Sequence, residues 1–287
     1  MVADATGSPL TIGAVQLCAT PDVEANLDQA ERLTREARDR GAEVVLLPEA
    51  FAFLGPEKAK EEILEPLPDP EGAGIGFTPG PIFARCQALA RDTGAHLVLG
   101  GFHESAPEPG RSYNTCVHLD PEGRLRARYR KIHLFDVSLA DGTVLRESAR
   151  TMAGDRAVTT ALPGARLGLT VCYDLRFPHL YQALADQGAT AIAVPSAFTR
   201  PTGAAHWHVL LRARAIESQC YVIAPAQHGR NWEKRSSYGH SLIVDPWGEV
   251  VAELEDGDGV LLADIDPERI SSVRAQLPSL SHRRSLC

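Results

Sequence analysis

Apolar positions recur with the period of an α-helix between residues 23 and 39. The apolar residues of this stretch are Val23, Leu27, Ala30, Leu33 and Ala37. Spacings of three and four place them on one face of an amphipathic helix, which we expect to end at Gly41. Continuous apolar runs on either side, at 11–17 and 43–47, predict buried strands. The order strand–helix–strand indicates an α/β fold.

Similar patterns predict elements along the rest of the chain. Strands are predicted at 96–102, 112–119, 124–130, 166–171, 190–194, 221–226, 241–244, 249–254 and 260–265, and helices at 81–92, 178–187, 205–218 and 267–276. Turn sequences at 120–123 and 245–248 favour hairpins. Hairpins mixed with strand–helix–strand units predict a mixed sheet, or two sheets, with helices outside. We expect a single domain over 1–287, with its core at about 10–270 and a C-terminal tail at 271–287.

Residues 55–80 break the pattern, because they are first charged and then rich in proline and glycine. Long segments beside strand ends often form lids or pocket walls. Composition equally allows a mobile surface insertion, and the two interpretations stay open at this point.

Composition narrows the class of protein. Hydrophobic residues make up 44% of the chain and charged residues 23%, and the net charge is −8. An acidic balance without a long basic run argues against nucleic acid and membrane surfaces as partners. Neither a secretory leader nor an apolar run of ~18 residues is found, so we expect a cytoplasmic protein. The six cysteines are scattered without zinc-ligand spacing, which indicates reduced thiols.

Cys172 has the most suggestive position among these thiols. An apolar run ends at Cys172, and Pro178 stands where a helix would begin. Amides at a helix N-terminus lower the pKa of a thiol and can hold an oxyanion. A lone cysteine is more often a small buried hydrophobe. Nucleophilic chemistry therefore requires a base and a cation elsewhere in the chain.

Two other strand ends provide such groups. Glu49 follows the run at 43–47, and Lys131 follows the strand at 124–130. Alone, each is an ordinary exposed side chain. Together with Cys172 they supply a carboxylate base, a cation for a developing oxyanion and a thiol nucleophile, the three groups that thiol acyl transfer needs.

The sequences around these three residues resemble the nitrilase superfamily of carbon–nitrogen hydrolases over about residues 10–284. The matching blocks are 46–50 (LLPEA), 129–136 (YRKIHLFD), 171–178 (VCYDLRFP), 14–16, 195–198, 212–217 and 245–248. The resemblance implies a four-layer α-β-β-α sandwich and a Glu49–Lys131–Cys172 triad. It also implies a homodimer, in which helices of two subunits pack face to face, or a higher homo-oligomer. It also implies that Glu147 orients the triad and the attacking water. No metal or organic cofactor is required.

The mechanism implied by the resemblance is acyl transfer through a thioester. Glu49 accepts the thiol proton while Lys131 and the backbone N–H of Tyr173 hold the oxyanion. For Glu49 to act both as base and as acid, we expect a pKa near neutrality, raised by burial and held down by Lys131.

Further blocks at 131–136, 147–148, 151–154, 202–207 and 238–241 resemble the Nit branch, in particular its amidases that hydrolyse deaminated glutathione to 2-oxoglutarate and cysteinylglycine. Such a substrate is a small anionic amide. Arg176 and Arg200 are therefore candidates for binding its carboxylates. Thr199 and His206 are candidates for other polar contacts, and Tyr173 for a pocket wall.

Other functions remain open from the sequence. Within the superfamily, the alternatives are an ω-amidase acting on 2-oxoglutaramate and an N-carbamoyl amino acid hydrolase; nitrilase activity fits the blocks around Lys131 and His206 less well. A catalytically silent scaffold is a further alternative, but it would not need Glu49, Lys131, Cys172 and Glu147 together. A redox-sensing thiol would need a resolving cysteine near Cys172.

Overall fold

The computed structural model describes residues 8–70, 77–138 and 144–284. Its described part contains two six-stranded sheets. The first has the order β16-β1-β2-β3-β4-β5, with strands Gly259–Ile265, Leu10–Gln16, Val44–Leu46, His96–Ser105, Ser112–Leu119 and Leu125–Arg130. The second has the order β15-β14-β11-β10-β9-β8, with strands Val250–Leu254, Ser241–Val244, Tyr221–Ala224, Ala191–Ala193, Ala165–Leu169 and Val158–Leu162.

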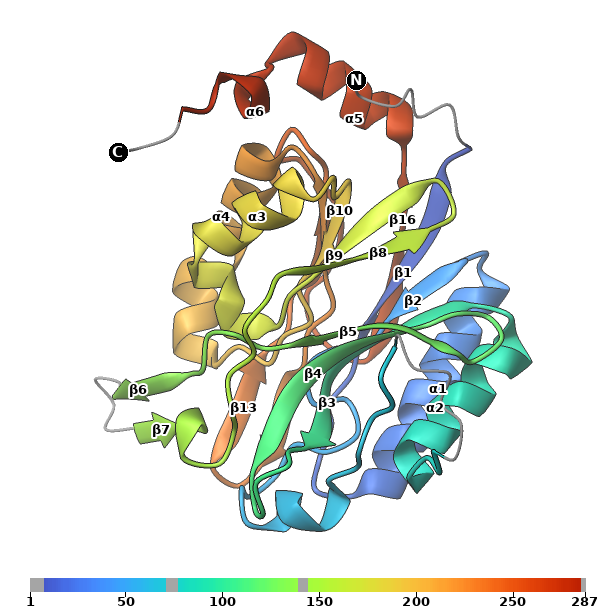
Figure 1. Ribbon diagram of the computed structural model, residues 1–287, viewed down its shortest axis with the longest axis vertical. Helices are drawn as coiled ribbons and strands as arrows, with labels where there is room; N and C mark the ends of the chain where they lie inside the picture. Colours follow the sequence, from blue (N-terminus) through green and yellow to red (C-terminus); the bar gives the residue numbers. More distant parts are fainter. Residues whose placement is uncertain (1–7, 71–76, 139–143, 285–287) are drawn as a thin grey trace.

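Helices cover the outer faces of the two sheets, which pack against each other (Figure 1). α1 (Val23–Asp39) and α2 (Pro81–Thr93) lie on the first sheet, and α3 (Pro178–Asp186) and α4 (Arg200–Ser218) lie on the second. The architecture is therefore the α-β-β-α sandwich that the sequence predicted. α5 (Pro267–Gln276) and α6 (Ser279–His282) run past one end of the sandwich (Figure 1). Among the described helices, none is both long and apolar enough to cross a membrane.

The continuous apolar run of β2 follows from burial on both faces of its sheet. Val44 and Leu46 point into the core between the sheets, whereas Val45 and Leu47 point into the core beneath α1 and α2. Side chains alternate across a strand, so a strand covered on both faces needs apolar residues at every position.

α1 has the predicted bounds and the predicted buried face. Its buried residues include Leu27, Ala30, Leu33 and Ala37. Its first turn is capped by Asp22, whose carboxylate accepts a hydrogen bond from the N–H of Ala25 at 3.1 Å.

Several elements lie where none was predicted. They are β6 (Asp136–Ser138), β7 (Val144–Arg146), β8, β12 (His228–Trp232), β13 (Arg235–Tyr238), α6 and three short 3₁₀ helices, η1 (Ala59–Ile63), η2 (Glu147–Ala149) and η3 (Cys172–Arg176). Apart from β8, the strands are short and polar and pair only in two-stranded sheets. α4 begins at Arg200 rather than at 205, and its first turn includes Gly203, against which the ring of Tyr238 packs closely.

Two glycines of β3 allow the two sheets to meet beside the site described below. The pairing of β3 with β4 shifts between Leu99 and Phe102, which marks a bulge. A Cβ on Gly100 would lie 2.3 Å from Cβ of Pro195, and Gly101 has φ +61°. Only glycine fits both positions.

Candidate active site

Four side chains singled out in the sequence line one pocket. Glu49 follows β2, Lys131 follows β5, Cys172 follows β9 by three residues, and Glu147 begins η2. Nζ of Lys131 lies 3.2 Å from Oε1 of Glu49 and 2.9 Å from Oε2 of Glu147. Together with Asn114, which contacts both carboxylates, these residues form what we call the pocket floor.

Glu49 is held by donors on both of its carboxylate oxygens. Oε1 accepts from Nδ2 of Asn114 at 2.9 Å, and Oε2 accepts from the N–H of Ala197 at 2.9 Å. Burial alone would raise the pKa of Glu49, but the ammonium of Lys131 and hydrogen bonds from Cys172 and Asn114 lower it from 4.5 to about 2. The expectation of a pKa near neutrality is therefore wrong. Glu49 is an ionised carboxylate in the resting site.

Lys131 is charged although its side chain is only 2% exposed. Burial opposes the charge, but the carboxylates of Glu147 and Glu49 outweigh it and raise the pKa of Lys131. Oε2 of Glu147 also accepts a hydrogen bond of 2.7 Å from the N–H of Phe135. The ammonium is therefore held between two positioned carboxylates.

Cys172 opens the 3₁₀ helix η3 with φ +50°, in the left-handed region. Burial, followed by the charge of Glu49, raises the pKa of the thiol well above its usual value of 9.0. The lowering expected from helix amides is therefore wrong for the resting site. The thiol keeps its proton and lies beside an ionised base, so proton transfer must accompany attack.

A buried carboxylate fixes the turn that carries Cys172. Oδ2 of Asp174 accepts from the hydroxyl of Tyr129 at 2.7 Å and from the N–H of Val171 at 2.9 Å. Oδ1 lies 2.7 Å from Nδ1 of His133. These bonds hold the backbone on both sides of the thiol in a conformation that a non-glycine residue adopts only at a cost.

Other polar and aromatic residues surround the opening of this cavity of about 140 Å³. We call Lys60, Tyr173, Arg176, Thr199 and Arg235 the pocket wall. Three of them, Tyr173, Arg176 and Thr199, were candidates from the sequence. Lys60 belongs to the 55–80 segment, part of which therefore serves as a wall; residues 71–76 lie outside the described residues.

Two further candidates for substrate contact lie outside the lining of the pocket. His206 is exposed on α4, and its Nδ1 lies 3.2 Å from Nη1 of Arg176. Arg200 is exposed at the start of α4. His206 thus contacts a residue of the pocket wall, whereas Arg200 does not line the pocket.

Three residues of the site carry no signal that sequence reasoning could have used. Asn114 lies inside β4, where the pattern shows only a strand, although it bridges Glu49 and Glu147. Lys60 and Arg235 lie in segments without strong periodicity. Nζ of Lys60 lies 2.8 Å from Glu57, and Nη2 of Arg235 donates to the carbonyl of Ala197 at 2.6 Å.

The geometry of the pocket floor suits acyl transfer. A protonated thiol lies beside an ionised carboxylate, and a buried ammonium stands close to where negative charge would develop on a substrate oxygen. The second carboxylate, Glu147, keeps this ammonium in place.

Comparison with known proteins agrees with this chemistry. The family model for carbon-nitrogen hydrolase matches residues 11–275. A Synechocystis protein named deaminated glutathione amidase is 44% identical over 278 residues, which cover 96% of this chain and 98% of that protein.

Two solved structures are also similar. The NitFhit protein of Caenorhabditis elegans has a TM-score of 0.86 at 37% identity; the match covers 97% of this chain and 66% of that one. Nit3 of Saccharomyces cerevisiae, a member of the nitrilase superfamily, has a TM-score of 0.84 at 30% identity, covering 97% of both chains. The chain therefore belongs to the carbon-nitrogen hydrolase family of the nitrilase superfamily and is an amidase.

Proposed function

We propose that this amidase hydrolyses deaminated glutathione to 2-oxoglutarate and cysteinylglycine. The observation that carries the proposal is the pocket itself: a floor built for thiol acyl transfer opens onto a wall that bears arginines. The name of the Synechocystis relative, which is similar over nearly its whole length, supports the same substrate.

Cys172 is the proposed nucleophile and Glu49 the proposed base. As Sγ of Cys172 attacks the amide carbon, the thiol proton passes to Glu49, which is ionised in the resting site. The carbonyl oxygen becomes an oxyanion, held by the ammonium of Lys131 and the N–H of Tyr173. Loss of the thiol proton to Glu49 also removes the carboxylate charge that had opposed a thiolate.

Collapse of this intermediate breaks the carbon–nitrogen bond. Protonated Glu49 gives its proton to the departing cysteinyl amine, and a thioester remains on Cys172. Glu49, ionised again, takes a proton from water while the water attacks the thioester, and Glu147 helps to orient the reactants. Collapse of the second intermediate releases 2-oxoglutarate and returns the proton to the thiol.

Arg176 is the proposed contact for a substrate carboxylate. It lines the pocket four residues after Cys172, and its guanidinium stacks near the rings of Tyr173 and Phe198. The planar fork of arginine suits a carboxylate. Arg235, also in the wall, is a second cation available to a substrate with carboxylates at both ends.

A substrate panel tests the proposal. Deaminated glutathione, 2-oxoglutaramate and N-carbamoyl amino acids are incubated with the enzyme, and 2-oxoglutarate, cysteinylglycine and ammonia are measured. We expect kcat/KM for deaminated glutathione to exceed the others by at least about 100-fold, a difference of about 3 kcal/mol in transition-state binding. Comparable values for all three would overturn the assignment, and Cys172→Ala supplies the blank.

We further propose a homodimer formed through the outer face of α4. Val209 and Ile216 of this helix are 69% and 45% exposed, which is unusual for large apolar residues on a helix that packs on a sheet. Light scattering on the native chain and on Val209→Asp tests this. A dimer that the substitution does not weaken would contradict the proposed face.

The cytoplasm is the compartment that we propose. It is supported by the cysteines of the described residues, all five of which are free (Cys18, Cys86, Cys116, Cys172 and Cys220), because a reducing compartment keeps thiols unpaired. Fractionation of cells that express the chain, followed by immunoblotting, tests the compartment. Recovery from an oxidising compartment would contradict it.

A further inference from the structure

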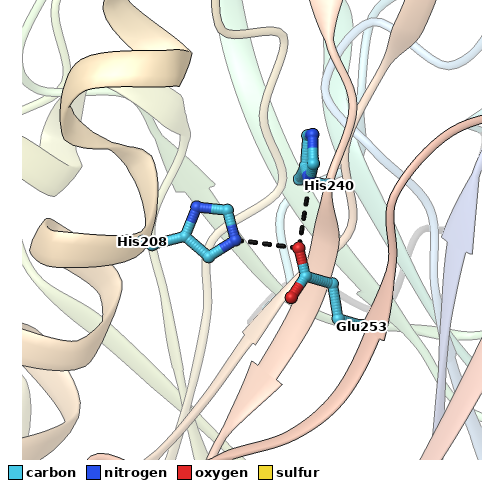
Figure 2. Close-up of side chains that lie close together, drawn as sticks. All are labelled: His208, His240 and Glu253. Carbon is cyan, nitrogen blue, oxygen red and sulfur yellow. Dashed lines mark hydrogen bonds and ion pairs between the residues drawn. The ribbon is translucent and has the colours of Figure 1, made fainter.

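His208, His240 and Glu253 converge outside the pocket. Figure 2 shows their side chains pointing toward one another from α4, from the turn between β13 and β14, and from β15. Nε2 of His208 lies 2.8 Å and Nδ1 of His240 lies 2.9 Å from the same atom, Oε1 of Glu253. One potential ligand atom from each residue lies within 4.8 Å of the other two. None of the three residues lines the pocket, so the proposed hydrolysis leaves them without a role.

The backbone around His240 fixes the position of its ring. His240 has φ +57°, and its N–H donates to the carbonyl of Glu255 at 3.1 Å. Its own carbonyl accepts a hydrogen bond of 2.7 Å from Nε1 of Trp207, the neighbour of His208 on α4. The ring also stacks on Tyr238, with 4.3 Å between centroids. His240 is thus positioned by contacts that do not involve its ligand atom, Nδ1.

Glu253 reaches the cluster because of strand pairing. It lies on β15 opposite Leu242 of β14, the residue two positions after His240. Within the described residues, the ion pairs of Glu253 are formed with His208 and His240 alone. The carboxylate is therefore not neutralised by a lysine or arginine of the described chain.

Two imidazoles and one carboxylate are a donor set that zinc prefers where one coordination position stays open. Metal–ligand distances of about 2.0–2.2 Å place the ligand atoms of a tetrahedral site about 3.3 Å apart. The observed separations of 2.8 and 2.9 Å are shorter by about half an ångström. The side chain of Glu253 is 29% exposed, so it is not enclosed by packing, and metal binding requires it to move outward by this half ångström.

We propose that His208, His240 and Glu253 bind a divalent transition-metal ion of the zinc class. The ion takes the lone pairs of Nε2 of His208 and Nδ1 of His240, any proton on these atoms moves to the other nitrogen of the same ring or to solvent, and water completes the coordination. The ion would join α4 to the β14–β15 hairpin. Thr199, immediately before α4, is in the pocket wall, so the ion steadies the helix that begins there.

Metal binding to the purified, metal-free full chain tests the proposal. Cys172→Ala serves as the parent, so that the thiol of the pocket does not bind the probe. Co²⁺ is followed by its visible absorption, and Zn²⁺ by calorimetry. We expect one ion per chain and a higher Tm with Zn²⁺. His208→Ala and Glu253→Gln should weaken binding at least about 100-fold. Loss of a residue that only contacts a metal ligand costs up to about 100-fold, and loss of the ligand itself should cost no less.

His228 offers a matched control. It lies on β12, and its Nε2 is 2.8 Å from Asp258 and its Nδ1 3.4 Å from Asp256, so it too is a histidine paired with carboxylates. His228→Ala should bind the ions as the parent does. Absence of saturable binding, or equal binding by the parent and Glu253→Gln, would overturn the proposal, as would equal losses in His228→Ala and His208→Ala. Glu253→Gln preserves side-chain shape, so the test stands even if His208→Ala does not fold.

Discussion

On the pocket floor, charges of opposite sign lie in contact and are mostly buried, whereas the two arginines of the pocket wall form no ion pair within the described residues. Lys131, 2% exposed, lies between Glu49 and Glu147. Arg176 is partly exposed, and its Nη1 lies 3.2 Å from Nδ1 of His206. Such a difference separates two tasks: the floor sets the protonation states needed for bond breaking, and the wall leaves a cation available to bind a substrate anion.

Removal of the nucleophile should abolish hydrolysis on the pocket floor and leave substrate binding at the pocket wall unchanged. We expect Cys172→Ala to lower kcat by about 10⁴-fold or more, because a covalent step cannot proceed without the thiol. Product assays measure activity, and equilibrium dialysis with the substrate measures binding. Retained turnover would end the thioester mechanism.

Loss of the buried ammonium should damage stability as well as activity. Lys131→Met removes the ammonium that Glu49 and Glu147 share, and we expect the free energy of unfolding from urea titrations to fall by about 3–5 kcal/mol. The double variant Lys131→Met/Glu147→Gln has one buried charge fewer and should recover part of this loss. Equal stability of the single and double variants would show that the charges of the floor are not coupled.

Glu49 should make the fold sensitive to acid. Its pKa is about 2 in the folded chain and 4.5 when unperturbed, so its contribution is complete above pH 4.5 and disappears as the pH falls toward 2. The shift corresponds to roughly 3 kcal/mol. In Glu49→Gln, the free energy of unfolding should fall less between pH 7 and pH 3 than in the native chain. Parallel pH curves would contradict the lowered pKa.

Substitutions in the wall should change selectivity and leave the chemistry nearly intact. We expect Arg176→Lys to raise KM for deaminated glutathione by about tenfold, with less effect on a neutral amide, because a bidentate contact is lost.

Arg200→Ala is the matched control for the wall, because Arg200 is exposed and does not line the pocket. Its KM for both amides should change by less than about twofold. If both substrates responded equally to Arg176→Lys, Arg176 would have no role in binding the anion.

The sequence predicted elements that carry strong apolar periodicity. α1 and α5 have their predicted bounds, and the strands that lead to Glu49, Lys131 and Cys172 were located within a few residues. Polar strands such as β12 and β13 were missed because they pair with each other and bury little apolar surface. The start of α4 was missed because Gly203 disfavours a helix when only the sequence is read. A glycine is needed there for close contact with Tyr238, a residue far away in the chain.

The composition of the site was easier to predict than its electrostatics. Motifs located the four reactive groups of the floor, but Asn114 is set by the pairing of β4, which no local pattern reveals. The pKa of Glu49 depends on the balance between burial, Lys131 and individual hydrogen bonds. These contributions can be weighed only when the distances between the groups are known. Arg200 does not line the pocket, which no local pattern could have told, because a position near the reactive residues in sequence does not fix the direction of a side chain.

The bulge of β3 has a consequence for protein engineering. Gly100 packs against Pro195 and the carbonyl of Leu47, while a Cβ on Gly101 would lie 2.7 Å from Cγ of Glu49. Libraries that randomise these two positions would consist mostly of misfolded chains, whatever activity is selected. New amide preferences are therefore more accessible through diversity at Lys60, Arg176 and Arg235, with the glycine pair held constant.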